Sequence, residues 1–171
     1  DRAWACCREA LQLDPDDVFG LWAEGILELN AGNHARAEAS CDRALRRARA
    51  VGYDVLVAWL LRLHGAIACS QEDYASAYGY EQESCRLYRK LGMPRHVMVG
   101  LCALGAIAAL RGDHERSRED WAEAQAVATS MGWGARQPRL GVVDLDLVDG
   151  DLASATRDLQ HVGQLPRDAR A

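Results

Sequence analysis

The sequence predicts an all-α protein built from antiparallel helix hairpins, and three observations lead to this prediction. Alanine is abundant while aromatic residues make up only 6% of the chain, a bias that favours close-packed helices over sheets. A short turn signature recurs along the chain at nearly equal spacing. Glycines recur at one fixed distance ahead of that signature. No segment has the alternating pattern that would predict a strand.

The turn signature occurs four times, at residues 31–37, 71–77, 111–117 and 149–155. Each copy has a polar or glycine residue at a helix end, then an Asn or Asp, and then the start of a new helix. The copies close on Ala37, Ala77, Ser117 and Ala155, which follow one another at nearly equal steps. Ala3 precedes Ala37 by a slightly shorter step and begins a fifth, partial unit. A period of about 40 residues predicts stacked helical repeats.

The positions around the small residue also align between copies. Four residues later come Cys7, Cys41, Glu81, Trp121 and Leu159, and three further on come Ala10, Ala44, Ser84, Ala124 and Val162. This spacing places both sets on one stripe of a helix. Twelve residues before the small position stand Gly25, Gly65 and Gly105, then Val143. Because glycine inside a helix costs about 1 kcal/mol relative to alanine, we expect close packing between the two helices of a hairpin at these positions.

The helices follow in order from these breaks. Residues 2–12 are expected to form the second helix of a hairpin whose first helix is missing. The first helices of four hairpins are expected at 17–31, 54–70, 95–111 and 138–149, and their second helices at 34–51, 74–91, 114–131 and 152–163. Breaks between hairpins fall at Gly52, at 92–94 and at 132–138.

The pattern resembles the tetratricopeptide repeat. Gly25, Ala37, Cys41 and Ala44 fall where that family has its glycine, its small alanine, a bulky residue and its second alanine, and Pro15 resembles the proline of the family's closing turn. The chain departs from the family where an aromatic residue is expected four residues before the glycine, since Leu21, Leu61 and Leu101 stand there.

The resemblance implies a right-handed superhelix of antiparallel hairpins formed by a single array over 1–171. The array would consist of a half repeat at 1–15, hairpins at 16–52, 53–93, 94–134 and 135–165, and a tail at 166–171. Repeats of this lengthened period resemble those in large bacterial transcriptional regulators. We therefore expect a fragment of a larger bacterial regulatory protein that acts in transcription regulation, and the absence of an initiator Met agrees with a processed or excised chain.

Composition excludes several classes of function. A net charge of −5 argues against a direct nucleic-acid partner, which needs clustered cations. No apolar run approaches the ~20 residues that span a membrane, and no signal peptide opens the chain, so we expect a cytoplasmic protein without a membrane partner. Only Lys90 is lysine among 20 basic residues, a bias that favours a bacterial, GC-rich origin. The 6 cysteines have no regular spacing and are expected to be buried, reduced thiols.

No motif indicates catalysis, so we predict that the chain is not an enzyme and has neither a cofactor nor a metal. The 5 histidines, at 34, 64, 96, 114 and 161, lack ligand spacing. The aspartates at 113 and 151 are expected to cap helices rather than to act as acids or bases. The arginines at 43, 46, 47 and 49 form a basic run that Asp42 interrupts, and we interpret them as a solvated convex face.

The family's partner-contacting positions lie on its first helices, which line the concave face. Among them we predict a partner-binding cluster of Phe19, Trp22, Asn30, Trp59 and Arg62. The indoles offer large apolar area with an N–H, and the guanidinium suits a carboxylate or a ring. The alternative is that both indoles only pack between hairpins. The further contact positions are 26 and 29 in the first hairpin, 66, 69 and 70 in the second, 99, 102, 106, 109 and 110 in the third, and 137, 140, 144, 147 and 148 in the fourth.

The leading functional prediction is a scaffold module that binds a protein or peptide through this concave face. Because Ile26, Asn30 and Ala66 stand where a clamp for a C-terminal carboxylate needs polar or cationic partners, that kind of clamp is not expected. One alternative is self-association into a homo-oligomer through end faces bearing Leu145, Leu147, Leu159 and Val162. Another is a small-molecule-sensing regulatory domain that uses the groove as a pocket.

Overall fold

The computed structural model describes residues 2–133, 138, 141, 142, 145, 146, 150, 151, 154–157, 159 and 160. Within 2–133 every regular element is an α-helix, so the predicted all-α class is confirmed. The chain divides into two compact units, 1–87 and 88–171, and each unit is described by itself.

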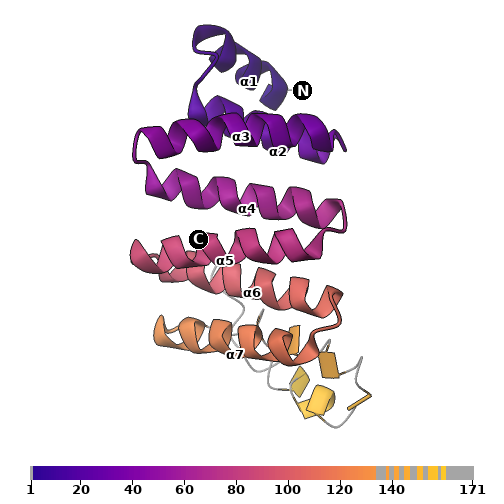
Figure 1. Cartoon of the computed structure of the whole chain (residues 1–171). Coiled ribbons are helices and arrows are strands. Elements are labelled where there is room, and N and C mark those ends of the chain that lie inside the picture. Colours follow the sequence, from indigo (N-terminus) through magenta and orange to yellow (C-terminus); the bar gives the residue numbers. More distant parts are fainter. Residues whose placement is uncertain are drawn as a thin grey trace. The chain divides into compact units, whose positions relative to one another are not determined.

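The first unit contains two helix hairpins preceded by a single helix (Figure 1). Its helices are α1 (Arg2–Leu13), α2 (Val18–Asn30), α3 (His34–Ala50), α4 (Asp54–Ser70) and α5 (Tyr74–Lys90), the last of which ends in the second unit. Helix α1 packs on α2, while α2 packs on both α3 and α4. The first helix of one hairpin therefore lies against the second helix of its own hairpin and against the first helix of the next.

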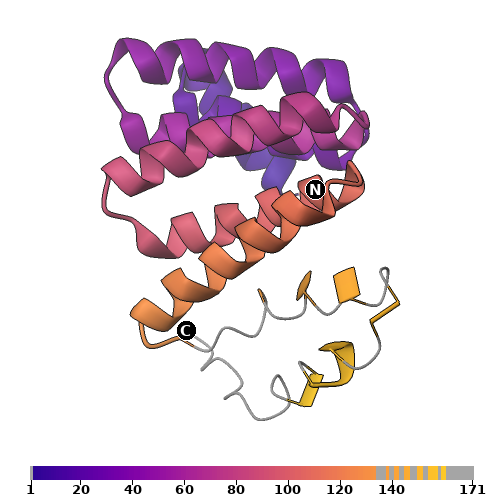
Figure 2. The same ribbon diagram turned by 60° about the horizontal axis from the view of Figure 1, so that its bottom comes forward.

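The second unit contains the hairpin of α6 (Pro94–Leu110) and α7 (His114–Ser130), which lie side by side in Figure 2. For the predicted helices at 138–149 and 152–163, the described residues 138, 141, 142, 145, 146, 154–157, 159 and 160 are helical. The remaining positions of these two ranges, including 143 and 162, lie outside the described residues. Across α1 to α7, the predicted ends agree with the observed ends to within one residue.

From the end of α2 onward, the turns share one construction, which explains why the predicted boundaries were accurate. In each of these turns a residue at positive φ follows the helix end, and the next backbone N–H donates to a carbonyl five residues earlier, as from Asn33 to Glu28 at 2.8 Å and from Tyr53 to Ala48 at 2.9 Å. Glycine supplies the left-handed residue at 32, 52, 92, 112, 132 and 150. Glu72, at φ 62, is the exception among the described non-glycine residues.

The aspartates of the signature cap helices as predicted. The side chain of Asp113 accepts the N–H of Arg116 at 3.2 Å, and Asp151 accepts that of Ser154 at 3.0 Å. Asn33 differs, because its side-chain amide donates to Glu28 Oε2 at 2.6 Å instead of capping α3.

The glycines inside the first helices allow neighbouring helices to pack closely, as the free-energy cost of a helical glycine predicted. A Cβ on Gly25 would lie 3.4 Å from the carbonyl oxygen of Ala37 and 2.9 Å from Leu63 Cδ2. A Cβ on Gly105 would lie 2.7 Å from the indole nitrogen of Trp121. Ala37, together with Cys41 and Ala44 on the same stripe, is fully buried. The prediction of close approach within hairpins is confirmed.

Candidate functional site

Four aromatic side chains on the first unit form what we call the α2–α4 aromatic face: Phe19, Trp22, Tyr53 and Trp59. Trp22 and Trp59 are tilted against each other, with ring centroids 5.5 Å apart and an interplanar angle of 34°. Phe19 and Tyr53 meet edge to face with centroids 6.0 Å apart. Both pairs join the start of α2 to the start of α4, so the packing of these two helices positions them.

The two aromatic pairs differ in exposure. Phe19 and Tyr53 are 46% and 44% exposed, values that are high for large apolar side chains. Trp22 and Trp59 are half-buried. The indoles therefore pack on each other and also keep part of their surface open to solvent. This arrangement combines the packing between hairpins and the exposed binding surface that the sequence left as alternatives.

Arg62 has a partner within its own chain. Its Nε lies 3.2 Å from Glu81 Oε1, and the Glu81 side chain is 5% exposed. Burial raises the pKa of Glu81 from its ordinary value of 4.5 to about 7, although the guanidinium lowers it. The predicted pairing of Arg62 with a carboxylate is thus made internally, and Glu81 rather than a ligand occupies its Nε.

Asn30 does not join the aromatic side chains. It is exposed at the last residue of α2. The eleven positions from Phe19 to Asn30 correspond to about 17 Å along a helix. The structure therefore brings two of the five predicted cluster residues, Trp22 and Trp59, into contact. Phe19 lies one helical turn from Trp22 and pairs with Tyr53, which the sequence did not predict. Asn30 lies at the opposite end of α2.

An apolar groove lies beside the aromatic face, between α1 and α2, with a volume of about 380 Å³. We call it the α1–α2 groove. It is lined by Ala3, Cys6, Cys7, Ala10, Asp17, Phe19, Gly20, Trp22, Ala23, Ile26 and Leu27. Phe19 and Trp22 belong both to this groove and to the aromatic face. The groove was not predicted, because it depends on how α1 crosses α2.

The remaining predicted contact positions vary in exposure. In the first unit Ile26, Leu29 and Cys69 are half-buried, and Ala66 is exposed. Ser70 is exposed and its hydroxyl lies 2.9 Å from His34 Nδ1. In the second unit Cys102 is 3% exposed and so does not face solvent as predicted, whereas Leu110 is 59% exposed. Positions 137, 140, 144, 147 and 148 lie outside the described residues.

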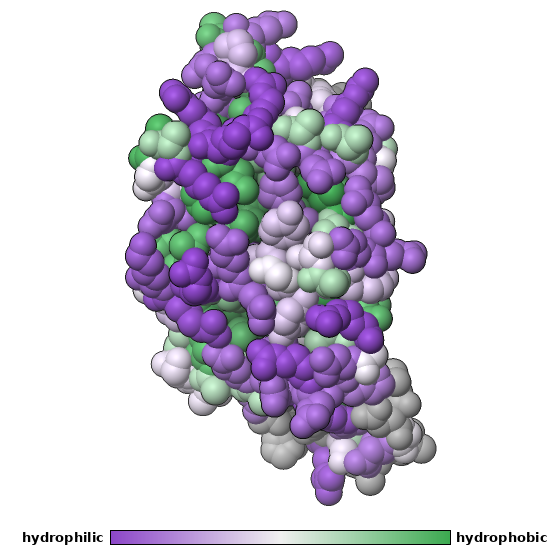
Figure 3. Space-filling view, viewed as in Figure 1, coloured by the Kyte–Doolittle hydropathy of each residue, from purple (hydrophilic) through white to green (hydrophobic). Residues whose placement is uncertain are grey.

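The surface in the view of Figure 3 is mostly hydrophilic, with hydrophobic side chains showing in patches between polar ones. Scattered exposed apolar residues are normal on a folded protein. The aromatic face is distinguished from them because its members form pairs and adjoin a groove.

The thiols do not form a reactive centre. No disulfide joins the 6 cysteines. Burial raises the pKa of Cys41 to about 12 and that of Cys102 to about 11, and it also raises the pKa of Cys7 and Cys69. A raised pKa keeps these thiols protonated at neutral pH, which makes them poor nucleophiles and metal ligands. The prediction of burial is wrong for Cys6, which is exposed.

The histidines and acidic residues within the described part of the chain contain no group of three that would hold a metal ion. Burial lowers the pKa of His64, which stacks on Tyr80 with centroids 5.1 Å apart and lies 3.3 Å from Asp42. Among the same residues no helix is long and apolar enough to cross a membrane.

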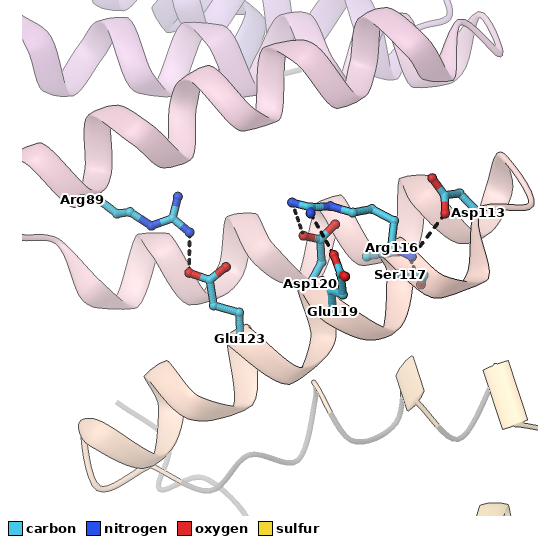
Figure 4. A network of polar contacts seen from close by, with 8 residues as sticks. Arg89, Asp113, Arg116, Ser117, Glu119, Asp120 and Glu123 are labelled. Atoms are coloured by element: carbon cyan, nitrogen blue, oxygen red, sulfur yellow. Dashed lines mark hydrogen bonds and ion pairs between the residues drawn. The ribbon is translucent and has the colours of Figure 1, made fainter.

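The charged residues mainly connect helices. In the basic run, Arg43 contacts Asp16 at 3.1 Å and Arg49 contacts Glu83 at 3.4 Å. On the second unit, a polar network joins α7 to the end of α5 through Arg89 and Glu123 at 2.6 Å (Figure 4). These contacts give Arg43, Arg49 and Arg89 structural partners on exposed surface.

The comparisons with known proteins agree with this architecture. The sequence profile of the tetratricopeptide repeat family matches residues 18–90. Comparison with curated protein sequences gave no match. Among solved structures, the chain is similar to RapI in its apo form, at 9% identity and a TM-score of 0.79 over 91% of this chain, and it spans 58% of the length of that protein.

Two further structures show the same fold. MamA is similar at 15% identity and a TM-score of 0.67, over 91% of this chain and 82% of that chain. BtubC from P. vanneervenii is similar at 15% identity and a TM-score of 0.79, over 99% of this chain and 73% of that chain. The register of glycines and small residues, the hairpin packing and the profile match agree, and residues 18–90 belong to the tetratricopeptide repeat family.

Proposed function

We propose that this chain is a scaffold module that binds a protein or peptide through the α2–α4 aromatic face, the face that the family resemblance predicts to be concave. The repeats and the structural likenesses support an interaction scaffold in general. The location of the site is supported by one observation, the pair of partly exposed aromatic contacts between α2 and α4.

The chemistry of this face suits a polypeptide. Aromatic side chains bury about 150–250 Å² each and dominate binding energy at protein interfaces. Phe19 and Tyr53 already hold each other at 6.0 Å, so little side-chain entropy is lost when a partner covers them. The groove that continues from Phe19 and Trp22 extends the apolar surface beyond the four rings.

The lengthened period of the repeat favours a place for this module within a larger bacterial regulatory protein, where it would act in the cytoplasm as a sensor or scaffold arm. Expression of the natural gene product, followed by measurement of its mass, tests this part of the proposal. A natural product no longer than this chain would contradict it.

The binding site is tested by a double variant, Phe19→Ala with Tyr53→Ala, because both side chains are exposed and their removal leaves the core intact. The bait is the wild-type chain, and the prey is a lysate of the source cells. A protein retained by the wild type is then purified, and its Kd is measured against both chains. We expect the double variant to bind at least tenfold more weakly, as is typical when two interface aromatics are lost.

Trp133→Ala is the matched control, since this aromatic side chain in the second unit is 43% exposed. The guanidinium carbon of Arg95 lies 5.5 Å from the centroid of its ring. We expect its Kd to stay within twofold of the wild-type value. Equal affinity of the double variant and the wild type would place the site elsewhere on the chain. Circular dichroism of all three chains verifies that the helices are intact.

A further inference from the structure

Arg62 is the charged residue on an otherwise uncharged set of predicted contact positions. In the first unit these positions are Phe19, Trp22, Ile26, Leu29, Asn30, Trp59, Arg62, Ala66, Cys69 and Ser70. The Arg62 side chain is 32% exposed. It follows Trp59 by three positions on α4, so the two residues are neighbours on one face of the helix. A partner that covers the paired indoles of the aromatic face therefore comes within reach of this guanidinium.

The guanidinium of Arg62 has unused donors. Its contact with Glu81 Oε1, at 3.2 Å, is made through Nε. Within the part of the chain that the structure describes, Nη1 and Nη2 of Arg62 donate no hydrogen bond. These two nitrogens carry most of the N–H donors of a guanidinium, and they suit the two oxygens of a carboxylate.

Glu81, on the other side of this contact, is incompletely paired. Its side chain is 5% exposed, and its Oε2 is buried without a hydrogen-bond partner among the described residues. Cys69 also faces it from α4, but burial and then the charge of Glu81 raise the pKa of this thiol, which keeps it neutral. Glu83, the next acidic residue on α5, pairs with Arg49 on α3 instead. In the described part of the first unit, Arg62 alone balances the charge of Glu81.

The Arg62–Glu81 pair has two charge states. It is neutral when Glu81 is ionised, and it carries one positive charge when Glu81 is protonated. Burial raises the pKa of Glu81 to about 7, although the guanidinium lowers it, so both states are populated near neutral pH. A partner that covers Arg62 removes water from the pair, and an approaching carboxylate repels an ionised Glu81. Both effects favour the protonated state.

We propose that the partner of the α2–α4 aromatic face places an acidic side chain on the terminal nitrogens of Arg62, and that Glu81 takes up a proton from solvent as this contact forms. The proposal rests on the proposed scaffold function, and it identifies a residue type of the partner and the response of binding to pH. Ala66, one turn further along this face of α4, offers no second cation. A singly charged carboxylate therefore fits this position better than a doubly charged phosphate does.

The linkage between binding and protonation sets the sign and the size of the effect. Binding is tightest below the pKa of Glu81, at about 7, and weakens as the pH rises through it. The protonated fraction of Glu81 falls about tenfold between pH 6 and pH 8, so the Kd of an acidic peptide should rise about tenfold over this range. Conversely, the bound peptide should raise the pKa of Glu81 further.

The probe is a phage-displayed library of random dodecapeptides, each fused through its C-terminus so that only side chains offer carboxylates. The full chain is the bait, at pH 6 and at pH 8. We expect Asp and Glu to be enriched among the peptides selected at pH 6 and not at pH 8. A selected acidic peptide is then synthesised with an amidated C-terminus, and fluorescence anisotropy measures its Kd between pH 6 and pH 8. Its counterpart with Asn or Gln in place of the acid should change by less than twofold.

Glu81→Gln separates the proton from the packing, because glutamine keeps an acceptor for Arg62. At pH 8 this variant should bind the acidic peptide within twofold of the wild type at pH 6, and its Kd should not depend on pH. Glu83→Gln is the matched control on α5 and should keep the wild-type pH profile, because its partner is Arg49. Arg62→Gln should weaken binding at pH 6 at least tenfold. Circular dichroism verifies that each variant is helical.

Selected peptides without acidic residues, or an acidic peptide whose Kd is the same at pH 6 and pH 8, overturn the proposal. A pH dependence that persists in Glu81→Gln also overturns it, because another group then takes up the proton. A library that yields no binder overturns it too, while the lysate experiment still decides the proposed function.

The proposed function is tested separately with the variant Phe19→Ala with Tyr53→Ala. Peptides that carry no acid but bind this variant more weakly than the wild type would leave the proposed function standing while the inference about Arg62 fails. Acidic peptides that bind this variant as tightly as the wild type would contradict the aromatic face as the binding site.

Discussion

Glu81 is a buried carboxyl whose ionisation should limit the stability of the first unit. Its side chain is 5% exposed, and its only described ion-pair partner is Arg62, at 3.2 Å. The informative perturbation is Glu81→Gln, which keeps the shape and an acceptor for Arg62 and removes the titrating group. Glu83→Gln on the same helix is the control, because Glu83 forms a more exposed ion pair with Arg49 at 3.4 Å.

The size of the effect follows from the pKa. Burial raises the pKa of Glu81 to about 7 in the folded chain, against an ordinary value of 4.5. Between these values the folded state binds more protons than the unfolded state, so the free energy of unfolding falls as the pH rises. The contribution is complete below pH 4.5 and lost above about pH 7, and the difference amounts to about 3 kcal/mol. Glu81→Gln should therefore gain about 3 kcal/mol relative to the wild type as the pH rises from 4.5 to 8.

The assay is urea denaturation of both chains at pH values from 4.5 to 8, followed by far-UV circular dichroism. The difference between the two free energies of unfolding cancels the titration of all other groups. The pKa itself is read from the side-chain carboxyl carbon of Glu81 by NMR. The control Glu83→Gln should change stability by at most about 1 kcal/mol, as is usual for exposed ion pairs.

A difference that stays flat between pH 4.5 and 8, or an NMR midpoint near 4.5, would refute this reasoning. Either result would mean that water or Arg62 solvates the carboxylate as well as bulk solvent does. A wild type that gains stability relative to Glu81→Gln as the pH rises would reverse the sign and exclude burial as the dominant cause.

Three further predictions concern packing, capping and thiol reactivity. Gly105→Ala should lower the melting temperature, because the added Cβ would lie 2.7 Å from an indole nitrogen. Gly65→Ala should leave the melting temperature unchanged or raise it, because the nearest atom to its Cβ would be 3.4 Å away. Thermal denaturation compares the two variants. Asp17→Ala should cost about 1 kcal/mol in urea denaturation because the carboxylate caps α2, and Asp17→Asn should recover most of this loss. Iodoacetamide at pH 8 should alkylate Cys6 before Cys41, whose pKa is raised to about 12, and peptide mass spectrometry that finds equal labelling would contradict the burial.

The hairpins and their boundaries were predictable because local rules set them. Glycine after a helix and Asp before the next helix define each turn within a few residues of sequence. The repeated Gly25 and Gly65 carried information about packing, since a costly residue at one register requires a neighbouring backbone. The organisation of 1–171 as a single array stays a prediction.

The candidate site was predictable only in part because it depends on contacts between hairpins. Trp22 and Trp59 stand at different registers, and their pairing follows from how α2 packs on α4, which no local pattern encodes. Arg62 was predicted to meet a carboxylate or a ring of the partner, but the chain itself supplies Glu81 at a stripe position where other repeats have Cys41 or Trp121. The break in that stripe was the available signal for a buried ion pair.

The uniform turns have a consequence for how the length of this chain can change. Glu72 holds the same left-handed backbone as Gly32, one repeat earlier, and the N–H of the following residue, Asn33 or Asp73, makes the same hydrogen bond at each site. Excision of 33–72 would join Gly32 directly to Asp73 and recreate a native turn at the new junction, and duplication of that block would do the same. A helix pair of one repeat length, such as α3 with α4, can thus be added or removed without a new kind of turn, so gene duplication and deletion can change the number of repeats.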